Sequence, residues 1–275
     1  MDLRRAIDGT PGEATSAPVV TVLGLGEAGG RLAADLVAAG AEVRAYDPAA
    51  APTPEGVVRF PDPLSAVTGE SVVLSLTAAS SARAAAESVL PGLLPGALYA
   101  DLNTASPGLK RELAAVVERA GGRFAHVARL GPVPARGLGA PALASGPGAR
   151  AFAALFEPLG MPVEVVSERT GDAAAMKLVR SVFMKGLAAS AIESLEAARV
   201  SGHAEWLEDE IAAVIGAPML ERLLEGSRKH AARRIDEMEA ARDLLLELGI
   251  EPRIAAAGAA QLAELAAAGS LQGGR

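Results

Sequence analysis

The chain of 275 residues contains no cysteine, three histidines and few aromatic residues. The absence of cysteine excludes disulfides, thiol catalysis and cysteine metal sites. The histidines, His126, His203 and His230, lie far apart without the spacing of metal ligands, so we expect no metal site. Trp206 is the only tryptophan, and the abundant alanine indicates closely packed helices and cores built from leucine, valine and alanine.

Long apolar runs and basic clusters are also missing from the chain. No apolar stretch reaches the ~18 residues of a membrane span, and the beginning of the sequence lacks the apolar core of a signal peptide. The net charge of −7, with no basic run, argues against a nucleic-acid surface. We therefore expect a cytoplasmic protein without membrane or nucleic-acid partners, and a flexible tail over residues 1–17.

A glycine-rich motif follows the first apolar run, residues 19–23. It reads Gly24-Leu25-Gly26-Glu27-Ala28-Gly29, and a helical pattern comes directly after it. In this G-x-G-x-x-G arrangement the first glycine allows a tight turn, the second lets a pyrophosphate approach the backbone, and the third lets the helix pack on the strand. The N–H groups at the helix start would hold the phosphates. The motif predicts a dinucleotide site at residues 24–29; the alternative is a glycine-rich turn that binds nothing.

An acidic residue ends the second predicted strand, Glu42 to Tyr46. Asp47 lies 23 residues after Gly24. At this distance a carboxylate would bind both ribose hydroxyls of NAD and repel the extra phosphate of NADP. We therefore expect NAD as the cofactor, with NADP less favoured. Leu76 and Thr77 are also predicted to contact the cofactor.

Strand and helix patterns alternate up to about residue 166, and only helical patterns follow residue 170. Buried strands are expected at 72–76, 97–100, 124–128, 143–145 and 162–166. Helices are expected at 80–89, 107–120, 148–156, 172–200, 205–215, 219–248 and 252–268. This order is typical of an α/β fold in which a doubly wound parallel Rossmann sheet is followed by an all-α domain.

The change of pattern predicts two domains. An NAD(P)-binding Rossmann domain is expected over residues 18–169, and an all-helical substrate and dimerisation domain over residues 170–270. Residues 269–275 are expected to be frayed.

Three further segments carry polar groups suited to chemistry. Residues 101–107 follow a strand, at the sheet edge where ligands bind in parallel sheets, and include Asn103 and Thr104. Residues 129–140 form a loop rich in glycine and proline with two arginines, Arg129 and Arg136. Residues 171–181 open the long helix and include Lys177.

Together with the glycine motif, these segments resemble the β-hydroxyacid dehydrogenase family over residues 18–270. That family includes 3-hydroxyisobutyrate dehydrogenase, tartronate semialdehyde reductase and, more distantly, 6-phosphogluconate dehydrogenase. Thr104 and Pro107 match its D-x-S-T-x-x-P segment, and Lys177 matches its catalytic lysine. The C-terminal part, with Lys185-Gly186 and residues 230–238, is similar to a 6-phosphogluconate dehydrogenase-like branch with its own helical domain.

The resemblance implies an NAD(P)-dependent oxidoreductase acting on the CH–OH group of a small anionic hydroxyacid or sugar acid. It also implies a homodimer formed through the helical domain. Several positions depart from the family pattern: Asn103 stands for serine, Pro134 for the serine of P-V-S-G-G, Arg136 for its second glycine, and Arg180 for the asparagine three residues after the lysine. These are the family's substrate-carboxylate positions, so the resemblance implies a different substrate.

The residues themselves also favour Lys177 as the general acid/base. Oxidising an alcohol needs a group that takes the hydroxyl proton, and a lysine can serve if burial and neighbouring cations lower its pKa. At about 100° per residue, Lys177, Ser181 and Lys185 share one helix face, which Arg180 flanks. Such a face is a good anion site; the alternative is a solvated charged face.

Other polar residues leave alternatives open. Asn103 could donate to the substrate or the nicotinamide, or simply be a turn residue. Arg129 and Arg136 could pair with a carboxylate, or belong to a surface loop. His230, Arg233 and Arg234 could reach a site across a dimer, or form a solvated stripe.

Three other functions fit parts of the pattern. An imine reductase shares the architecture of the resembled superfamily but usually lacks the lysine. A decarboxylating reaction of the phosphogluconate type would use the extra cations. A non-catalytic NAD(P)-binding sensor would explain the altered substrate motifs.

Overall fold

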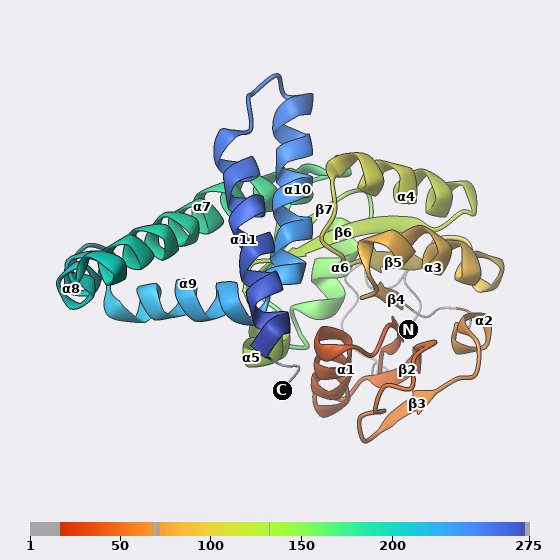
Figure 1. The fold of residues 1–275 in the computed structure, drawn as a ribbon. Coiled ribbons are helices and arrows are strands. Elements are labelled where there is room, and N and C mark those ends of the chain that lie inside the picture. Colours follow the sequence, from red (N-terminus) through yellow and green to blue (C-terminus); the bar gives the residue numbers. More distant parts are fainter. Residues whose placement is uncertain (1–16, 68, 70–71, 132, 273–275) are drawn as a thin grey trace. The chain divides into compact units, whose positions relative to one another are not determined.

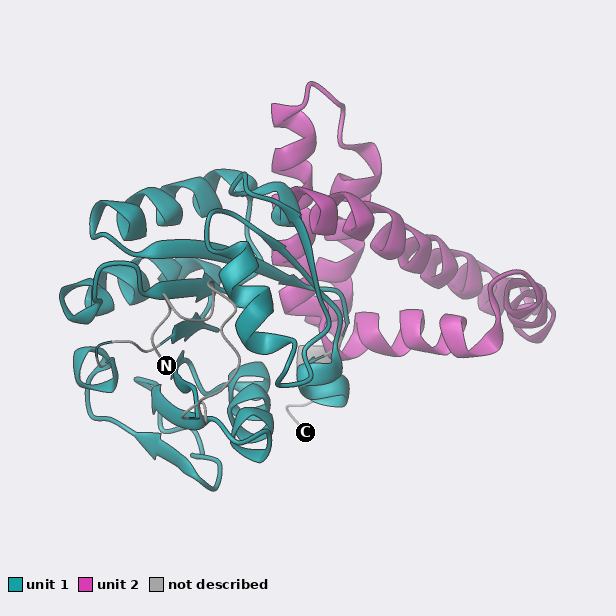
Figure 2. Ribbon diagram, turned by 180° about the vertical axis from the view of Figure 1, so that it is seen from behind, with its two compact units in different colours: residues 1–174 teal, residues 175–275 magenta. Residues whose placement is uncertain are grey.

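The computed structural model describes residues 17–67, 69, 72–131 and 133–272, and side chains up to residue 268. Apart from Ala17, the predicted flexible tail lies outside the described residues, as do the last three residues of the predicted frayed end. The chain divides into two compact units, the first ending at Ala174 and the second beginning at Ala175 (Figure 2). Among the described residues, no helix has the length and apolarity to cross a membrane.

The first unit contains an eight-stranded sheet with the order β3-β2-β1-β4-β5-β6-β7-β8. Its strands are β1 (Val19–Leu23), β2 (Glu42–Tyr46), β3 (Val57–Arg59), β4 (Val72–Ser75), β5 (Leu98–Asp101), β6 (Arg123–Arg129), β7 (Ala142–Ser145) and β8 (Val163–Ser167). The strands β1 to β6 pair in parallel, with the doubly wound order of a Rossmann fold. The predicted fold class is thus confirmed.

Two strands, β7 and β8, run against the expected direction. β7 pairs antiparallel with β6 and parallel with β8, so the sheet is mixed rather than wholly parallel. Among its described residues, the connection from β6 to β7 contains only the short helix α5 (Val133–Arg136) and a single 3-10 turn (Gly137–Gly139). A parallel neighbouring strand needs a crossover connection, usually through a longer helix. This connection is too short for a crossover, so β7 returns antiparallel beside β6.

Helices cover both faces of the sheet because strand side chains alternate between them (Figure 1). On one face, α1 (Glu27–Ala38) and α6 (Ala149–Phe156) pack against residues such as Val22 and Leu74. On the other, α3 (Ala82–Val89) and α4 (Pro107–Arg119) pack against Val73 and Tyr99. The sequence patterns missed β3 and the four-residue helices α2 (Pro63–Ala66) and α5. Such short elements show too little periodicity to be recognised.

The second unit is built from helices. They are α7 (Asp172–Ser201), which begins in the first unit, α8 (Ala204–Ile215), α9 (Ala217–Lys229), α10 (Ala231–Glu247) and α11 (Arg253–Gln272). The predicted single helix 219–248 is wrong, because the backbone leaves helical geometry at His230, with φ −125° and ψ 30°. The break lets α10 pack along α11 through Met238, Ala255 and Leu262. α11 also continues four residues beyond its predicted end at Ala268.

Candidate functional site

The glycine motif forms the turn between β1 and α1. Gly24 has φ +97°, and a Cβ there would lie 2.4 Å from the carbonyl oxygen of Leu76. A Cβ on Gly29 would lie 1.9 Å from the carbonyl oxygen of Gly24. Both positions therefore need glycine, the first for its backbone angle and the second for the close approach of α1 to the turn.

Gly26 differs from these two glycines because it faces open space. It is exposed, and a Cβ on it would meet no described atom within 4 Å. It is also the N-cap of α1, and no described side chain caps this helix end. The first N–H groups of α1 are thus available to an anion, where the strand order reverses between β1 and β4. This open cradle fits a pyrophosphate.

Asp47 lies directly beside this turn. One carboxylate oxygen accepts a hydrogen bond from the backbone N–H of Leu25 at 2.6 Å, and the other accepts from that of Ala49 at 2.7 Å. The guanidinium of Arg59 donates to the backbone carbonyl of Asp47 at 2.7 Å, which holds the loop after β2. The carboxylate is therefore held against the glycine turn, in reach of a nucleotide ribose bound there.

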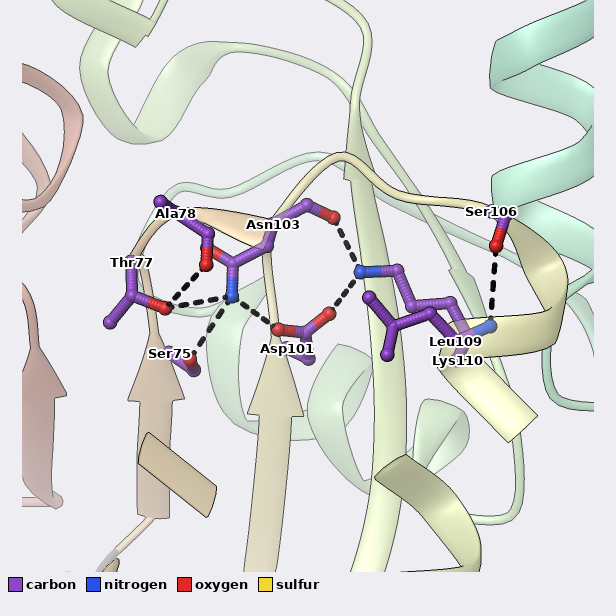
Figure 3. Close-up of polar contacts among 8 residues, drawn as sticks. All are labelled: Ser75, Thr77, Ala78, Asp101, Asn103, Ser106, Leu109 and Lys110. Carbon is purple, nitrogen blue, oxygen red and sulfur yellow. Dashed lines mark hydrogen bonds and ion pairs between the residues drawn. The ribbon is translucent and has the colours of Figure 1, made fainter. Parts of the chain in front are cut away.

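The ends of β4 and β5 bring further predicted residues to the same edge of the sheet (Figure 3). The backbone N–H of Leu76 donates to the carbonyl of Leu23, which ties the end of β4 to the glycine turn. The side-chain nitrogen of Asn103 lies 3.1 Å from Ser75 Oγ and 3.4 Å from Thr77 Oγ1. Leu76, Thr77 and Asn103 are therefore neighbours of the turn that holds Gly24.

A buried ion pair that the sequence analysis missed lies behind Asn103. Lys110 Nζ donates to Asp101 Oδ2 and, at 2.7 Å, to the backbone carbonyl of Asn103. Both charged side chains are completely buried. A signal was present in the sequence: Lys110 falls on the apolar stripe of its helix with Leu113, Ala114 and Val117, where a charge needs a partner.

The glycine- and proline-rich loop after β6 is fastened to α1. Arg31 Nη1 donates to the carbonyl of Pro134 at 2.8 Å, and Asp35 accepts from the backbone N–H of Leu138 at 2.9 Å. Of the two predicted arginines, Arg136 is exposed. Arg129 is buried and donates to the carbonyls of Gly137 and Leu138.

Burial lowers the pKa of Arg129 to about 10, against the opposing effect of Asp35. Thr104, the residue after Asn103, is half-buried.

In the second unit, the predicted residues of α7 surround a glutamate of α10. Glu237 accepts hydrogen bonds from Ser181 Oγ and, at 2.7 Å, from Lys185 Nζ. Lys185 also lies 3.1 Å from Ser181 Oγ. Lys177 is half-buried and its charge acts on Glu237, while Arg180 is exposed. The glutamate was visible in the sequence, but its role as the partner of this helix face was not.

The charged groups in this cluster shift one another's pKa values. Burial by itself would raise the pKa of Glu237, but Lys185 and Lys177, with the two hydrogen bonds, lower it to about 2. Burial lowers the pKa of Lys185, and the charges of Arg234 and Arg180 add to that effect against the opposing charge of Glu237. The cluster therefore carries an excess of cations around one nearly buried anion.

The three residues predicted to form a charged stripe, His230, Arg233 and Arg234, have different surroundings in the structure. His230 is the joint between α9 and α10, and Arg233 is exposed. Arg234 is half-buried and donates to Ser227 Oγ at 2.7 Å. Its pKa is lowered by burial and by Arg233, while Glu237 opposes the shift.

Comparisons with known proteins identify both parts of the chain. Residues 19–135 match the model of the NAD binding domain of 6-phosphogluconate dehydrogenase. Residues 198–265 match that of a domain of unknown function, DUF1932. A conserved protein whose structure was described as similar to those of 3-hydroxyacid dehydrogenases is 27% identical, with 91% of this chain and 99% of that chain covered and a TM-score of 0.68.

Two other solved structures share the fold. The 3-hydroxyisobutyrate dehydrogenase of Mycobacterium tuberculosis, solved with L-serine, is 23% identical, with 91% of this chain and 94% of that chain covered and a TM-score of 0.76. A reductive aminase from Aspergillus terreus, solved with NADPH, cyclohexanone and allyl amine, is 19% identical, with 92% and 95% covered and a TM-score of 0.59.

These matches support an NAD(P)-binding domain and a dehydrogenase or reductase related to the hydroxyacid dehydrogenases. The match to the nucleotide-binding model covers the glycine turn, Asp47 and Asn103, and the second match lies within the helical part. Together, these matches support the β-hydroxyacid dehydrogenase family, with a C-terminal helical domain, as the family of this chain.

Proposed function

We propose that this protein interconverts a small anionic hydroxyacid, or a sugar acid, and its oxo form, with NAD as cofactor and Lys177 as general acid/base. The observation that carries the proposal is the cation-rich cluster of α7, in which half-buried Lys177 acts on nearly buried Glu237 beside Lys185 and Arg180. An excess of cations suits an anionic substrate.

The first unit supplies the residues that would hold the cofactor. The turn at Gly26 and the start of α1 would bind the pyrophosphate, and Asp47 would accept from the ribose hydroxyls. Since Asp47 lies on the β2 side of the turn, the nicotinamide end would lie toward Leu76, Thr77 and Asn103. When bound, the cofactor accepts a hydride from the alcohol carbon or returns one to the carbonyl.

The second unit supplies the groups for the proton and the substrate. In oxidation, Lys177 Nζ would take the hydroxyl proton, and in reduction it would return it. Arg180, exposed on the same helix, would pair with the substrate carboxylate.

The test combines cofactor titration with turnover. NADH and NADPH are titrated by fluorescence, and hydroxy and keto acids are then assayed with the wild type, Lys177→Ala and Lys229→Ala. We expect Lys177→Ala to lower kcat by about 100-fold or more while NADH still binds. Lys229→Ala is the matched control, because Lys229 is exposed at the end of α9.

Other outcomes would point to other functions. Full turnover by Lys177→Ala would remove the proposed role of this lysine. Reduction of cyclic imines without turnover of any acid would favour the imine reductase alternative, which the reductive aminase likeness in fold accommodates. Tight cofactor binding without turnover on either panel would favour a nucleotide sensor.

We also propose that the protein is a homodimer formed through its helical unit. In the part of the chain that the structure describes, α8 has no buried residue, and Phe183, Trp206 and Val214 are all more than 60% exposed. Exposed apolar groups of this size are typical of an interface. Light scattering tests the dimer, since a monomeric mass at micromolar concentration would refute it. Because NAD is drawn from the cellular pool, we further propose a cytoplasmic location, which cell fractionation tests.

A further inference from the structure

Asn103, Asp101 and Lys110 form a closed ring of polar contacts at the end of β5 (Figure 3). Lys110 Nζ donates to one carboxylate oxygen of Asp101 and to the backbone carbonyl of Asn103. The other carboxylate oxygen of Asp101 accepts from the side-chain nitrogen of Asn103 at 2.5 Å. Lys110 and Asp101 are completely buried, and Asn103 is 5% exposed. The buried ion pair between Lys110 and Asp101 is thus hydrogen-bonded to Asn103, at the edge of the candidate nucleotide site.

The ring determines which end of the Asn103 amide faces inward. A carboxylate in an ion pair has only acceptor oxygens, so its neighbour must present the NH2 group and not the carbonyl oxygen. The same side-chain nitrogen of Asn103 also contacts Ser75 Oγ and Thr77 Oγ1. Among the residues that the structure describes, the side-chain oxygen of Asn103 has no hydrogen-bond donor. It is therefore the end of the amide that is left to receive one.

We infer that Lys110 and Asp101 are positioning residues that hold Asn103 with its side-chain oxygen turned to the cofactor, where it accepts a hydrogen bond from the carboxamide NH2 of the nicotinamide. This inference rests on the proposed function for its ligand, while the orientation of Asn103 stands on the ring alone. The inferred role differs from both alternatives considered from the sequence, in which Asn103 was either a donor or a turn residue. The buried charge thus acts on the cofactor through another residue and touches neither cofactor nor substrate.

The orientation can be observed directly, because Asn103 is the only asparagine in the chain. Protein labelled with 15N at asparagine gives a single side-chain NH2 group in the NMR spectrum. In the wild type we expect its two protons to exchange with water at least tenfold more slowly than in Asp101→Leu/Lys110→Met, a variant that adds no second asparagine. The double variant removes both charges together, so neither is left buried alone. Lys229→Met, at an exposed lysine, is the control and should keep the slow exchange.

The ligand is tested with a dinucleotide that lacks the donor. The reduced 3-acetylpyridine analogue of NADH carries a methyl group in place of the carboxamide NH2. A single neutral hydrogen bond corresponds to a preference of about fivefold, so we expect the wild type and Lys229→Met to bind NADH about fivefold more tightly than the analogue. The double variant should lose this preference, a ratio that a general loss of stability would not change.

The outcomes separate the inference from the proposed function. Fast exchange of the Asn103 NH2 protons in the wild type, or slow exchange kept in the double variant, would overturn the ring as the orienting device. Slow exchange with equal wild-type affinity for NADH and the analogue would overturn the assignment of the ligand. Failure of the wild type to bind either dinucleotide would overturn the proposed function, and amide exchange would still decide the orientation.

Discussion

Lys185 on α7 and Glu237 on α10 form an ion pair of 2.7 Å with both side chains nearly buried. Ser181 donates to the same glutamate, so two groups of one helix are bound to one carboxylate of another. Beside this pair, Leu178, Ala241 and Leu244 form an apolar cluster between the same helices. The polar contacts therefore determine how α7 and α10 align, and this alignment places the face that carries Lys177.

Replacing Glu237 with glutamine should destabilise the protein at neutral pH and change its response to acid. The pKa of Glu237 is about 2, against an ordinary value of 4.5, so folding favours the charged form. The stabilisation is fully present above pH ~4.5 and is lost as the pH falls toward 2, at up to about 3 kcal/mol. Urea unfolding at several pH values between 7 and 3 measures both effects.

The control for this change is Glu239→Gln, at an exposed position two residues further along α10. It should leave the free energy of unfolding at pH 7 within about 0.5 kcal/mol of the wild type. If Glu237→Gln kept both the stability at pH 7 and the acid response of the wild type, the ion pair would contribute nothing to the fold.

Replacing two glycines of the turn with alanine should affect different properties, cofactor binding for Gly26 and stability for Gly29. Gly26→Ala adds a methyl group in open space where the phosphates are expected. It should weaken NADH binding about tenfold or more while leaving the free energy of unfolding within about 0.5 kcal/mol. Gly29→Ala brings a Cβ within 1.9 Å of the Gly24 carbonyl oxygen. Relieving that overlap should cost about 3 kcal/mol of stability.

Fluorescence titration and urea unfolding separate these two effects. Gly139→Ala is the control, because Gly139 is exposed and a Cβ there would meet no described atom within 4 Å. It should change neither quantity. Normal NADH binding by Gly26→Ala would show that the phosphates do not approach the turn at this residue.

Features that depend on a few neighbouring residues could be predicted from the sequence. The turn at Gly24 and the packing at Gly29 follow from local backbone geometry, and both have the geometry expected of them. The N-cap at Ser106, which accepts from the backbone N–H of Leu109, is likewise a local property. The order of strands and helices could be predicted for the same reason, because the periodicity of apolar residues is a property of neighbouring positions.

Features that depend on which elements meet could not be predicted in the same way. The direction of β7 is decided by how the chain returns from β6, and the break at His230 by how α10 packs on α11. Glu237 lies 52 residues from Lys185, so only the fold reveals them as partners. Lys110 is the exception, because a lysine on an apolar stripe was visible without the fold.

Removing the Asp35 carboxylate should loosen the loop after β6. Asp35 accepts from the backbone N–H of Leu138 and pairs with Arg31, which in turn holds the carbonyl of Pro134. In Asp35→Ala the amide of Leu138 should exchange about tenfold faster, since a hydrogen bond to a charged group, of about 1.5 kcal/mol, is lost. Hydrogen exchange read by mass spectrometry over residues 130–141 measures it. Glu27→Ala, exposed on the same helix, should leave this exchange unchanged.

Asparagine at position 47 should reduce the preference for NADH over NADPH. Asp47 is held beside the glycine turn through Leu25, where its charge would accept from the ribose hydroxyls and repel a 2′-phosphate. A charge-assisted hydrogen bond contributes about 1.5 to 3 kcal/mol, so Asp47→Asn should weaken NADH binding about tenfold and leave NADPH binding the same or stronger. Glu55→Gln, at an exposed position between β2 and β3, is the control. Wild-type protein that bound NADPH more tightly than NADH would refute the role given to Asp47.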